Sequence, residues 1–300
     1  MVDEMIRAPL TDAIVEIFDS LPSQLQDAAR YLLDNPEDVA LLSMREQARR
    51  AGLRPWTMVR LAKRLGFDGY EPLRSLYANA MRQGELGFAG KAGTQLAHQK
   101  EVGDRALAAE MIKSLSAQIA DLGEPQRLDA LATAAERLHA ARRIFCLGLR
   151  SSHPVIAHFA YVMSFLGEKA VMLDGASGTG TDAIRLATGQ DILFVASVAP
   201  YTRLTVDLAR RAASGGVPVI AVTDSVVSPL VSLATLSVLV PTESPSFFHA
   251  MAPAFVVGEI LAALIAGKGG DKSLAAIRRT EDQLSQLDIH ISPPRGRRKA

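Results

Sequence analysis

The chain has 300 residues, 48% of them hydrophobic and 22% charged, and a net charge of +1 at pH 7. It can bury a sizeable core and favours two domains, while its single cysteine, Cys146, excludes an intrachain disulfide and is expected to be a small buried hydrophobe. The acidic N-terminus does not resemble a signal peptide, and the most apolar stretch, residues 250–266, is too short and too interrupted to span a bilayer. We therefore expect a soluble cytoplasmic protein with no membrane partner.

The first 83 residues predict an all-helical domain. Helical patterns cover residues 12–18 and 23–33, and the second stops before an Asn-Pro pair that disfavours helix. Further helices are expected at residues 43–51, 55–65 and about 72–82. The domain is therefore expected to cover residues 1–83.

Residues 43–70 predict a helix-turn-helix. Ser43 can cap the first helix, Gly52 supplies the permissive backbone that a tight turn needs, and Pro55 suits the first turn of the second helix. Met58, Val59, Ala62 and Leu65 are expected to face inward. Gly66 is expected to close the second helix.

Charge supports a DNA-binding interpretation of this motif. Residues 43–83 hold nine basic and three acidic residues, whereas residues 1–42 hold two basic and nine acidic ones. A local basic field attracts DNA phosphates, and side chains of the second helix can reach base edges in the major groove. The alternative is an ordinary three-helix module with a solvated basic face. The expected DNA-binding residues are Arg45, Arg54, Trp56, Thr57, Arg60, Lys63 and Arg64.

The rest of the chain predicts an α/β domain. Glycines at 84, 87, 90 and 93 indicate a linker over residues 84–103, followed by helices at 104–122 and 127–140. Short apolar runs then alternate with helical stretches, which predicts a doubly wound, five-stranded parallel sheet over residues 104–270. The predicted strands are residues 143–149, 170–173, 192–198, 217–222 and 236–240, and the helices between or after them are 155–166, 201–213 and 248–266. A C-terminal helix and a short basic tail are expected at residues 271–300; the tail either touches DNA phosphates or is a disordered, solubilising end.

Polar loops follow the first three predicted strands. Ligands bind beyond the carboxyl ends of such strands, and a loop that opens a helix offers free N–H groups to an anion. Each loop alone is better explained by turn and capping chemistry, but their common position predicts a pocket for a small polar molecule, such as a phosphorylated one. The expected ligand-binding residues are Arg150, Ser151, Ser152, Ser177, Thr179, Ser197, Tyr201 and Thr202.

The helix-turn-helix with its ending Leu65-Gly66-Phe67 and Gly69-Tyr70, followed by a linker and the five-strand unit, resembles the RpiR/MurR family of bacterial transcriptional regulators. The resemblance covers about residues 21–267 and implies a sugar isomerase (SIS) domain that is not an enzyme but senses a metabolite, often a phosphosugar. It implies a double-stranded DNA operator, a small anionic effector, and a homodimer or homotetramer formed through the SIS domain. Ser152 matches the end of the family's Gly-x-Gly-x-Ser loop, and Ser197 and Thr202 match the ends of its Ser-x-Ser-Gly-x-Thr phosphate loop.

The sequence departs from both family loops. Arg150 replaces the second glycine of the first loop, and Ala199 and Pro200 replace the inner Ser-Gly of the other. Proline has no N–H to offer a phosphate, so cradling by the later loop is weakened. Arg150 could compensate by pairing with a phosphate or carboxylate, or could face solvent or a subunit contact. Tyr201 could contact the ligand or cap the helix.

Two alternative functions remain at this stage: a catalytic SIS-fold sugar-phosphate isomerase, and a DNA-binding protein whose SIS domain is a purely structural dimerisation unit. An isomerase needs a positioned base, and the candidates are Glu243, His249, His153 and His158. None has a convincing partner spacing, and His158 is expected to be packed or at an interface. We therefore expect no catalytic residues. No His, Cys and acidic residues show metal-ligand spacing, so we expect no metal and no cofactor.

Overall fold

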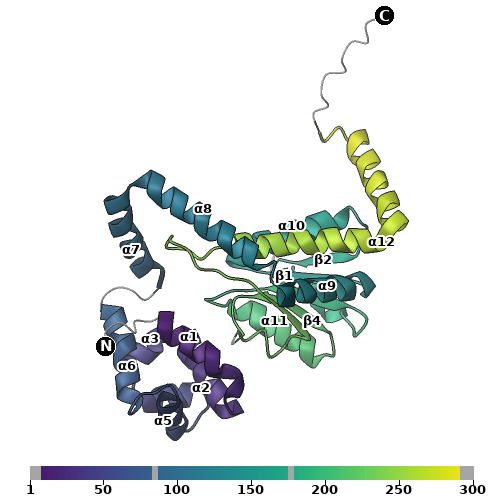
Figure 1. The fold of residues 1–300 in the computed structure, drawn as a ribbon. Helices are drawn as coiled ribbons and strands as arrows, with labels where there is room; N and C mark the ends of the chain where they lie inside the picture. The colour runs from purple at the N-terminus through teal and green to yellow at the C-terminus, as the bar shows by residue number, and fades with distance from the viewer. Residues whose placement is uncertain (1–7, 83–86, 175–178, 227, 291–300) are drawn as a thin grey trace, which may run out of the picture.

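The computed structural model describes residues 8–82, 87–174, 179–226 and 228–290. An N-terminal helical region is followed by a five-stranded parallel sheet with helices on both faces (Figure 1). The predicted α/β fold class is confirmed. The helices of the first region are α1 (Ala8–Ile17), the short 3-10 helix η1 (Phe18–Ser20), α2 (Ser23–Asp34), α3 (Pro36–Leu41), α4 (Met44–Arg50), α5 (Pro55–Arg64) and α6 (Tyr70–Arg82).

The expected turn between α4 and α5 is present. Ser43 caps α4, its hydroxyl accepting the Glu46 N–H at 3.3 Å. Gly52 adopts φ +68°, which side-chain-bearing residues rarely adopt, and the Leu53 N–H closes the turn onto the Ala48 carbonyl at 2.8 Å. Pro55 begins α5 in the first turn, where its missing N–H costs nothing.

Gln47 of α4 fixes the other helices around this turn. Its buried side-chain amide donates to the carbonyls of Val39 at 3.1 Å and Leu42 at 2.8 Å, and its side-chain oxygen accepts a hydrogen bond from the Tyr70 hydroxyl. One polar side chain thus joins α3, α4 and α6. Around it lies an apolar core to which α1, α2 and α5 also contribute.

Three helices connect this region to the sheet: α7 (Gly87–Val102), α8 (Asp104–Asp121) and α9 (Pro125–Ala140). The glycine-rich stretch that predicted a linker is therefore largely helical. None of the α7 residues is buried. In Figure 1, α7 and α8 form an arch from the N-terminal region to the sheet.

The sheet has the order β2-β1-β3-β4-β5, and all neighbouring pairs are parallel. Its strands are β1 (Ile144–Gly148), β2 (Ala170–Leu173), β3 (Ile192–Ala196), β4 (Val219–Thr223) and β5 (Leu236–Leu239). The remaining helical elements are η2 (Arg150–Ser152), α10 (His153–Ser164), η4 (Asp182–Leu186), α11 (Arg203–Ser214) and α12 (Ala252–Gln286). All five strands were predicted, with ends that differ by at most two residues.

Alternate residues of each strand enter two separate cores, as the side-chain period of two dictates. Ile144 and Cys146 of β1 pack on the face covered by α9, α10 and α12, whereas Phe145 and Leu147 pack on the face covered by α11 and η4. Cys146 is fully buried, as expected, and burial raises the pKa of its thiol to about 12. This thiol is therefore an inert part of the core.

The apolar helix α12 covers both the helix predicted at residues 248–266 and the predicted C-terminal helix, with a break between them at Gly270, where φ is +51°. Among the described residues it alone is long and apolar enough to cross a bilayer by length and composition. Its first half instead packs on the sheet, where Val257, Leu261 and Ile265 are buried in the core with α9 and α10. Packing on the sheet explains why this helix is apolar.

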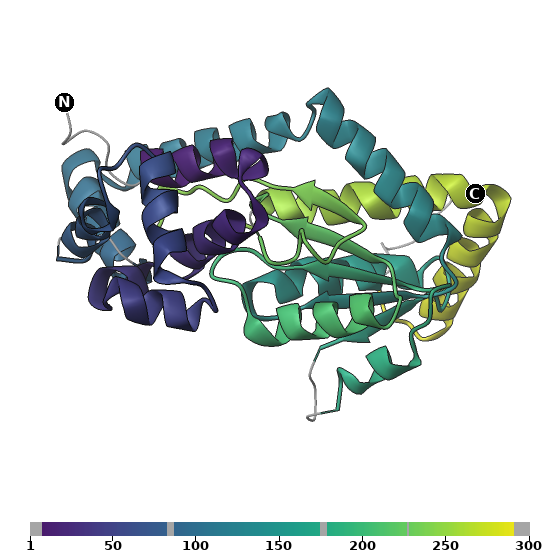
Figure 2. The same cartoon turned by 90° about the horizontal axis from the view of Figure 1, so that it is seen from below.

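The N-terminal helices lie beyond one end of the sheet (Figure 2). Val226, three residues after β4 ends, packs against their apolar core. The loops at the carboxyl end of β4 are thus next to the helical region.

Candidate functional site

The neighbouring strands β1 and β3 end at the point where the strand order reverses, which is where ligands bind in open parallel sheets. Gly148 ends β1, and a Cβ there would lie 2.6 Å from Ile156 Cγ1 and 2.7 Å from the Ser152 carbonyl oxygen. Only glycine allows this approach. This close approach brings η2 and the first turn of α10 against the end of β1.

The loop after β1 presents an arginine and two serines. Arg150 is exposed and adopts φ +55°, the left-handed region where glycine is easiest, which gives a physical reason for the glycine found at this place in the family loop. Ser151 is half-buried, and its Oγ lies 2.9 Å from His249 Nε2. Ser152 is buried. The guanidinium of Arg150 makes no ion pair within the described part of the chain.

The loop after β3 is held by a residue that the sequence analysis did not single out, Asp224. Its carboxylate accepts the Tyr201 hydroxyl at 2.9 Å and the Ala199 N–H at 3.2 Å. The Thr223 hydroxyl donates to the carbonyl of buried Ser197 at 2.8 Å. The Ala199 N–H is thus already engaged and Pro200 has none, so this loop offers fewer N–H groups to an anion than the family's loop does.

Tyr201 is anchored rather than free. Burial and the neighbouring Asp224 raise the pKa of its phenol above the usual range, so it stays a neutral donor to Asp224. Thr202 is half-buried next to it, and Thr179, after β2, is exposed. Ser177 lies outside the described residues. The structure therefore gathers Ser151, Ser152, Ser197, Tyr201 and Thr202 at the ends of two adjacent strands, with Arg150 exposed in the first of the two loops.

His249 closes the site from the segment between β5 and α12. Burial and the nearby Lys91 lower the pKa of its imidazole, which keeps the ring neutral at pH 7. Its ring also lies 4.2 Å from that of Phe248. Asp224 lies two residues after the fourth predicted strand, so its place in the chain was a usable signal, whereas Lys91 gave none because it comes from α7.

The other candidate bases lie in less suggestive surroundings. Glu243 is exposed, and its backbone carbonyl accepts the Gln118 side chain at 2.6 Å. His153 is half-buried at the start of α10. His158 packs against Phe255, with ring centroids 4.5 Å apart, as expected for a packed histidine.

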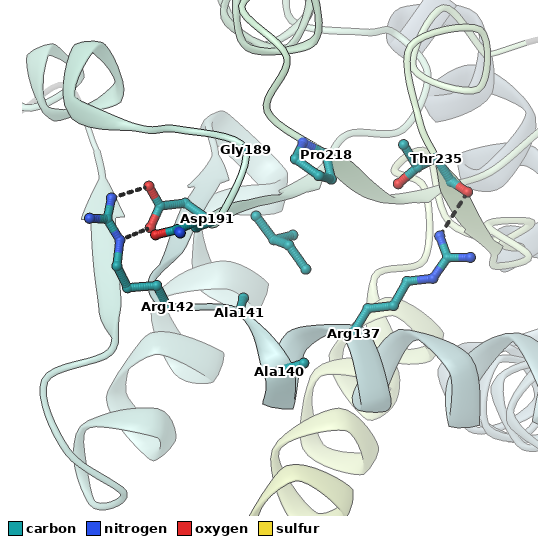
Figure 3. A pocket seen from close by; sticks show the side chains of 10 residues that line it. Arg137, Ala140, Ala141, Arg142, Gly189, Asp191, Pro218 and Thr235 are labelled. Carbon is teal, nitrogen blue, oxygen red and sulfur yellow. Dashed lines mark hydrogen bonds and ion pairs between the residues drawn. The ribbon is translucent and has the colours of Figure 1, made fainter.

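A groove of about 680 Å³ lies at the opposite, amino end of the strands (Figure 3). Arg142 pairs there with the buried Asp191, with Nη2–Oδ2 at 2.7 Å and Nε–Oδ1 at 3.0 Å, and Arg137 donates to the Thr235 carbonyl at 3.1 Å. These arginines are thus occupied in holding strand ends and loops together. The groove is not part of the strand-end site.

The second surface of interest is the outer side of α5. Trp56 is 63% exposed, and the cationic side chains of this surface are exposed and make no ion pair within the described residues. They are Arg54, Arg60, Lys63 and Arg64, with Arg45 on α4. By contrast, Arg49 and Arg50 pair with Glu46, and Arg74 pairs with Glu71.

Thr57 does not belong to this outer surface. We expected it among the DNA-binding residues, but it is only 6% exposed. It lies one turn before the buried Leu61 and therefore shares the packed face of α5.

Residues 137–264 match the SIS domain family. This part of the chain is a SIS domain. No curated protein matches the sequence.

Two solved structures extend the comparison. The NanR protein of Vibrio vulnificus, complexed with ManNAc-6P, is similar over 93% of this chain and 98% of its own, with 22% identity and a TM-score of 0.56. The sugar isomerase domain of an RpiR transcription factor from Sphaerobacter thermophilus is similar over 59% of this chain and 97% of its own, with 25% identity and a TM-score of 0.53. The helical region and the SIS domain together thus have the fold of NanR. A putative sugar-phosphate isomerase from Listeria monocytogenes is similar over 62% of this chain and 99% of its own, with 17% identity and a TM-score of 0.45.

Proposed function

We propose that the protein is a DNA-binding transcriptional regulator whose SIS domain binds a small anionic metabolite, a sugar phosphate or a related acid, that modulates operator binding. The observation that carries this proposal is the unpaired cationic surface of α5, in the same chain as a SIS domain with a polar strand-end site. An isomerase has no use for such a surface. A regulator needs both a DNA-binding surface and a ligand site.

In this proposal α5 is the recognition helix. Its N-terminal residues and outer side enter the major groove, where arginine side chains bind guanine edges and phosphates. Thr57 is left out of the contact set because it is packed inside the helical region. The proposed contacts are Arg54, Trp56, Arg60, Lys63 and Arg64, with Arg45 on a phosphate.

The ligand site lies mainly on the loop after β1. Arg150 supplies an unpaired guanidinium and Ser151 and Ser152 supply hydroxyls, a donor set that suits a phosphate or carboxylate. The similarity to NanR complexed with ManNAc-6P supports a sugar phosphate as the first ligand to test. Ser177, Thr179, Ser197 and Thr202 complete the proposed set, with Tyr201 as an anchor of the second loop.

Two copies pair through their SIS domains, in a homodimer or a homotetramer, and act in the cytoplasm. Two recognition helices then face a pseudo-palindromic operator with half-sites about 34–36 Å apart, or a multiple of that spacing. The ligand shifts their relative placement through a coupling of about 1–3 kcal/mol.

The isomerase alternative rests on one observation, the neutral His249 beside Ser151 in the strand-end site. We expect no turnover when the purified protein is incubated with pentose and hexose phosphates. Turnover that Glu243→Gln or His249→Gln abolishes would contradict a purely regulatory function.

DNA selection from a random pool, followed by a mobility-shift assay, tests the DNA-binding half. We expect enrichment of a two-fold symmetric sequence. Arg60→Ala should weaken its binding and reduce the dependence of log K on log salt by about one per half-site, because one phosphate or base contact is lost. Arg211→Ala, an exposed arginine on α11, is the matched control. Equal affinities for the two variants would show that α5 does not read DNA.

A further inference from the structure

One face of α7 is fastened to the segment that closes the strand-end site. The ring of Phe88 stacks on Phe248, with centroids 5.0 Å apart and planes 15° from parallel, and lies 6.1 Å from the ring of His249. Two turns further on, Gln95 Oε1 accepts the Phe247 N–H at 2.9 Å. Figure 1 shows this segment extending from the sheet towards α7.

Lys91 lies on the same face, between these two attachments. Phe88, Lys91 and Gln95 are spaced by three and four residues, so their side chains leave the helix on one side. The Lys91 ammonium is close enough to lower the pKa of His249. His249 in turn contacts Ser151 at 2.9 Å, which joins α7 to the loop after β1. Lys91 itself forms no ion pair within the described ranges of the chain.

Within the described residues, the other contacts of α7 are with α8 and are exposed and polar: His98 Nε2 lies 2.7 Å from Glu110 Oε2, and the Gln99 side-chain amide donates to Asp104 at 2.9 Å. None of its residues is buried, and its glycines at 87, 90 and 93 lower its intrinsic helical stability. A helix with so few buried contacts has a low free energy of local opening. One added ionic contact therefore changes its position or its stability more than it would change a core helix.

We infer that Lys91 is a ligand-binding residue of the strand-end site, and that α7 is the lid through which the DNA-binding region detects the anion. A phosphate or carboxylate bound beside Arg150 and Ser151 pairs with the Lys91 ammonium and holds α7 on the segment at Phe248 and His249. This inference rests on the proposed function and adds to it a residue outside the SIS domain. Because α7 follows the helical region in the chain, a change in α7 is transmitted to α6.

Titration calorimetry on the full-length protein tests the inference, with inorganic phosphate and a panel of hexose 6-phosphates as probes. Lys91→Met keeps the length of the side chain and removes its charge. It should weaken binding of the tightest probe by about tenfold or more, as expected for the loss of a charge-assisted contact. Lys91→Arg should restore most of the affinity. Lys100→Met is the control, because Lys100 is exposed and nine residues along α7, on its opposite side.

Hydrogen exchange supplies a second readout, which a merely structural lysine would not change. The probe should slow exchange over residues 88–102 in the wild type and in Lys100→Met, but not in Lys91→Met. Wild-type protein that binds no probe would overturn the proposed ligand and this inference together. If wild-type protein and Lys91→Met bind a probe equally well, only the inference fails.

Discussion

Asp191 is a buried carboxylate at the amino ends of the strands. Its oxygens accept from Arg142, Arg143 and the Thr188 N–H, and these partners lower its pKa well below the usual range. Because the folded-state pKa is depressed, the stability that Asp191 contributes is present above its unfolded-state pKa of about 3.9 and is lost as the pH falls below it.

Asp191→Asn tests this ion pair. The variant should lose about 2–3 kcal/mol of unfolding free energy at pH 7, because hydrogen bonds to a charged acceptor are replaced by weaker ones to a neutral amide, while the half-exposed Arg142 guanidinium remains hydrated. The difference in unfolding free energy between the wild type and the variant should stay constant between pH 7 and 5 and become smaller below about pH 4. Urea unfolding at each pH measures this difference. If the difference did not change with pH down to about pH 3, Asp191 would not be held as the anion in the folded protein.

The Tyr201 hydroxyl is bound to Asp224 at 2.9 Å, and this contact orders the loop after β3. Tyr201→Phe removes the hydrogen bond while keeping the ring, so we expect a loss of about 1–2 kcal/mol in unfolding free energy and weaker ligand binding. Tyr161→Phe is the control, since Tyr161 is 59% exposed on α10. Equal stabilities of the two variants in urea would argue against the anchoring role of Asp224.

At the level of elements, the hydrogen bonds of Gln47 fix how α3, α4 and α6 pack together. Gln47→Leu fills a similar volume but leaves the Val39 and Leu42 carbonyls and the Tyr70 hydroxyl without their partner. We expect the helical region to lose about 2–4 kcal/mol of stability, since these are buried polar groups. Circular dichroism during thermal unfolding measures the loss, with the exposed Gln24→Leu as the control. An unchanged midpoint would show that these hydrogen bonds do not hold the helices together.

Elements with a strong periodic pattern could be predicted from the sequence, and those that depend on tertiary contacts could not. The strands, all short apolar runs between polar loops, were located to within two residues. The helix α3 was missed because Asn35-Pro36 indicated an end rather than a new start, and α7 was missed because glycines 87, 90 and 93 weaken its helical pattern. The position of α7 depends on Phe88 and Gln95 meeting residues 247–248, far away in sequence.

The residues of the candidate site also divide into those that could be predicted from the sequence and those that depend on tertiary contacts. The serines after β1 and β3 were predicted because parallel strands bring their carboxyl ends to one edge. Thr57, which we expected among the DNA-binding residues, lies on the packed face of α5, since residue type alone does not fix the rotation of a short helix. Asp224 and Lys91 acquire their roles only when separate segments fold together.

At the scale of the whole molecule, both the helical region and the connecting helix α7 contact the SIS domain. Val226 packs on the helical core, and α7 is fastened to the segment after β5. Both contacts lie beside the strand-end site, so a ligand there is well placed to alter how the two parts are arranged.

Ser152→Ala separates the two parts of the function. It changes the ligand site without touching α5, so DNA affinity without ligand should match the wild type, while the response to ligand should fall by about fivefold or more. Mobility shifts with and without the best-binding sugar phosphate measure this. A normal response would move the ligand site elsewhere in the SIS domain.

The most direct test of regulation by a small anion is a fluorescence-anisotropy isotherm of the wild-type protein on its selected DNA, at fixed salt, with and without a saturating sugar phosphate such as ManNAc-6P or another binder from the hexose 6-phosphate panel. We expect the DNA dissociation constant to change by about 5- to 150-fold, the range of common allosteric couplings. DNA and sugar phosphate that both bind with no effect on each other's affinity would contradict the account.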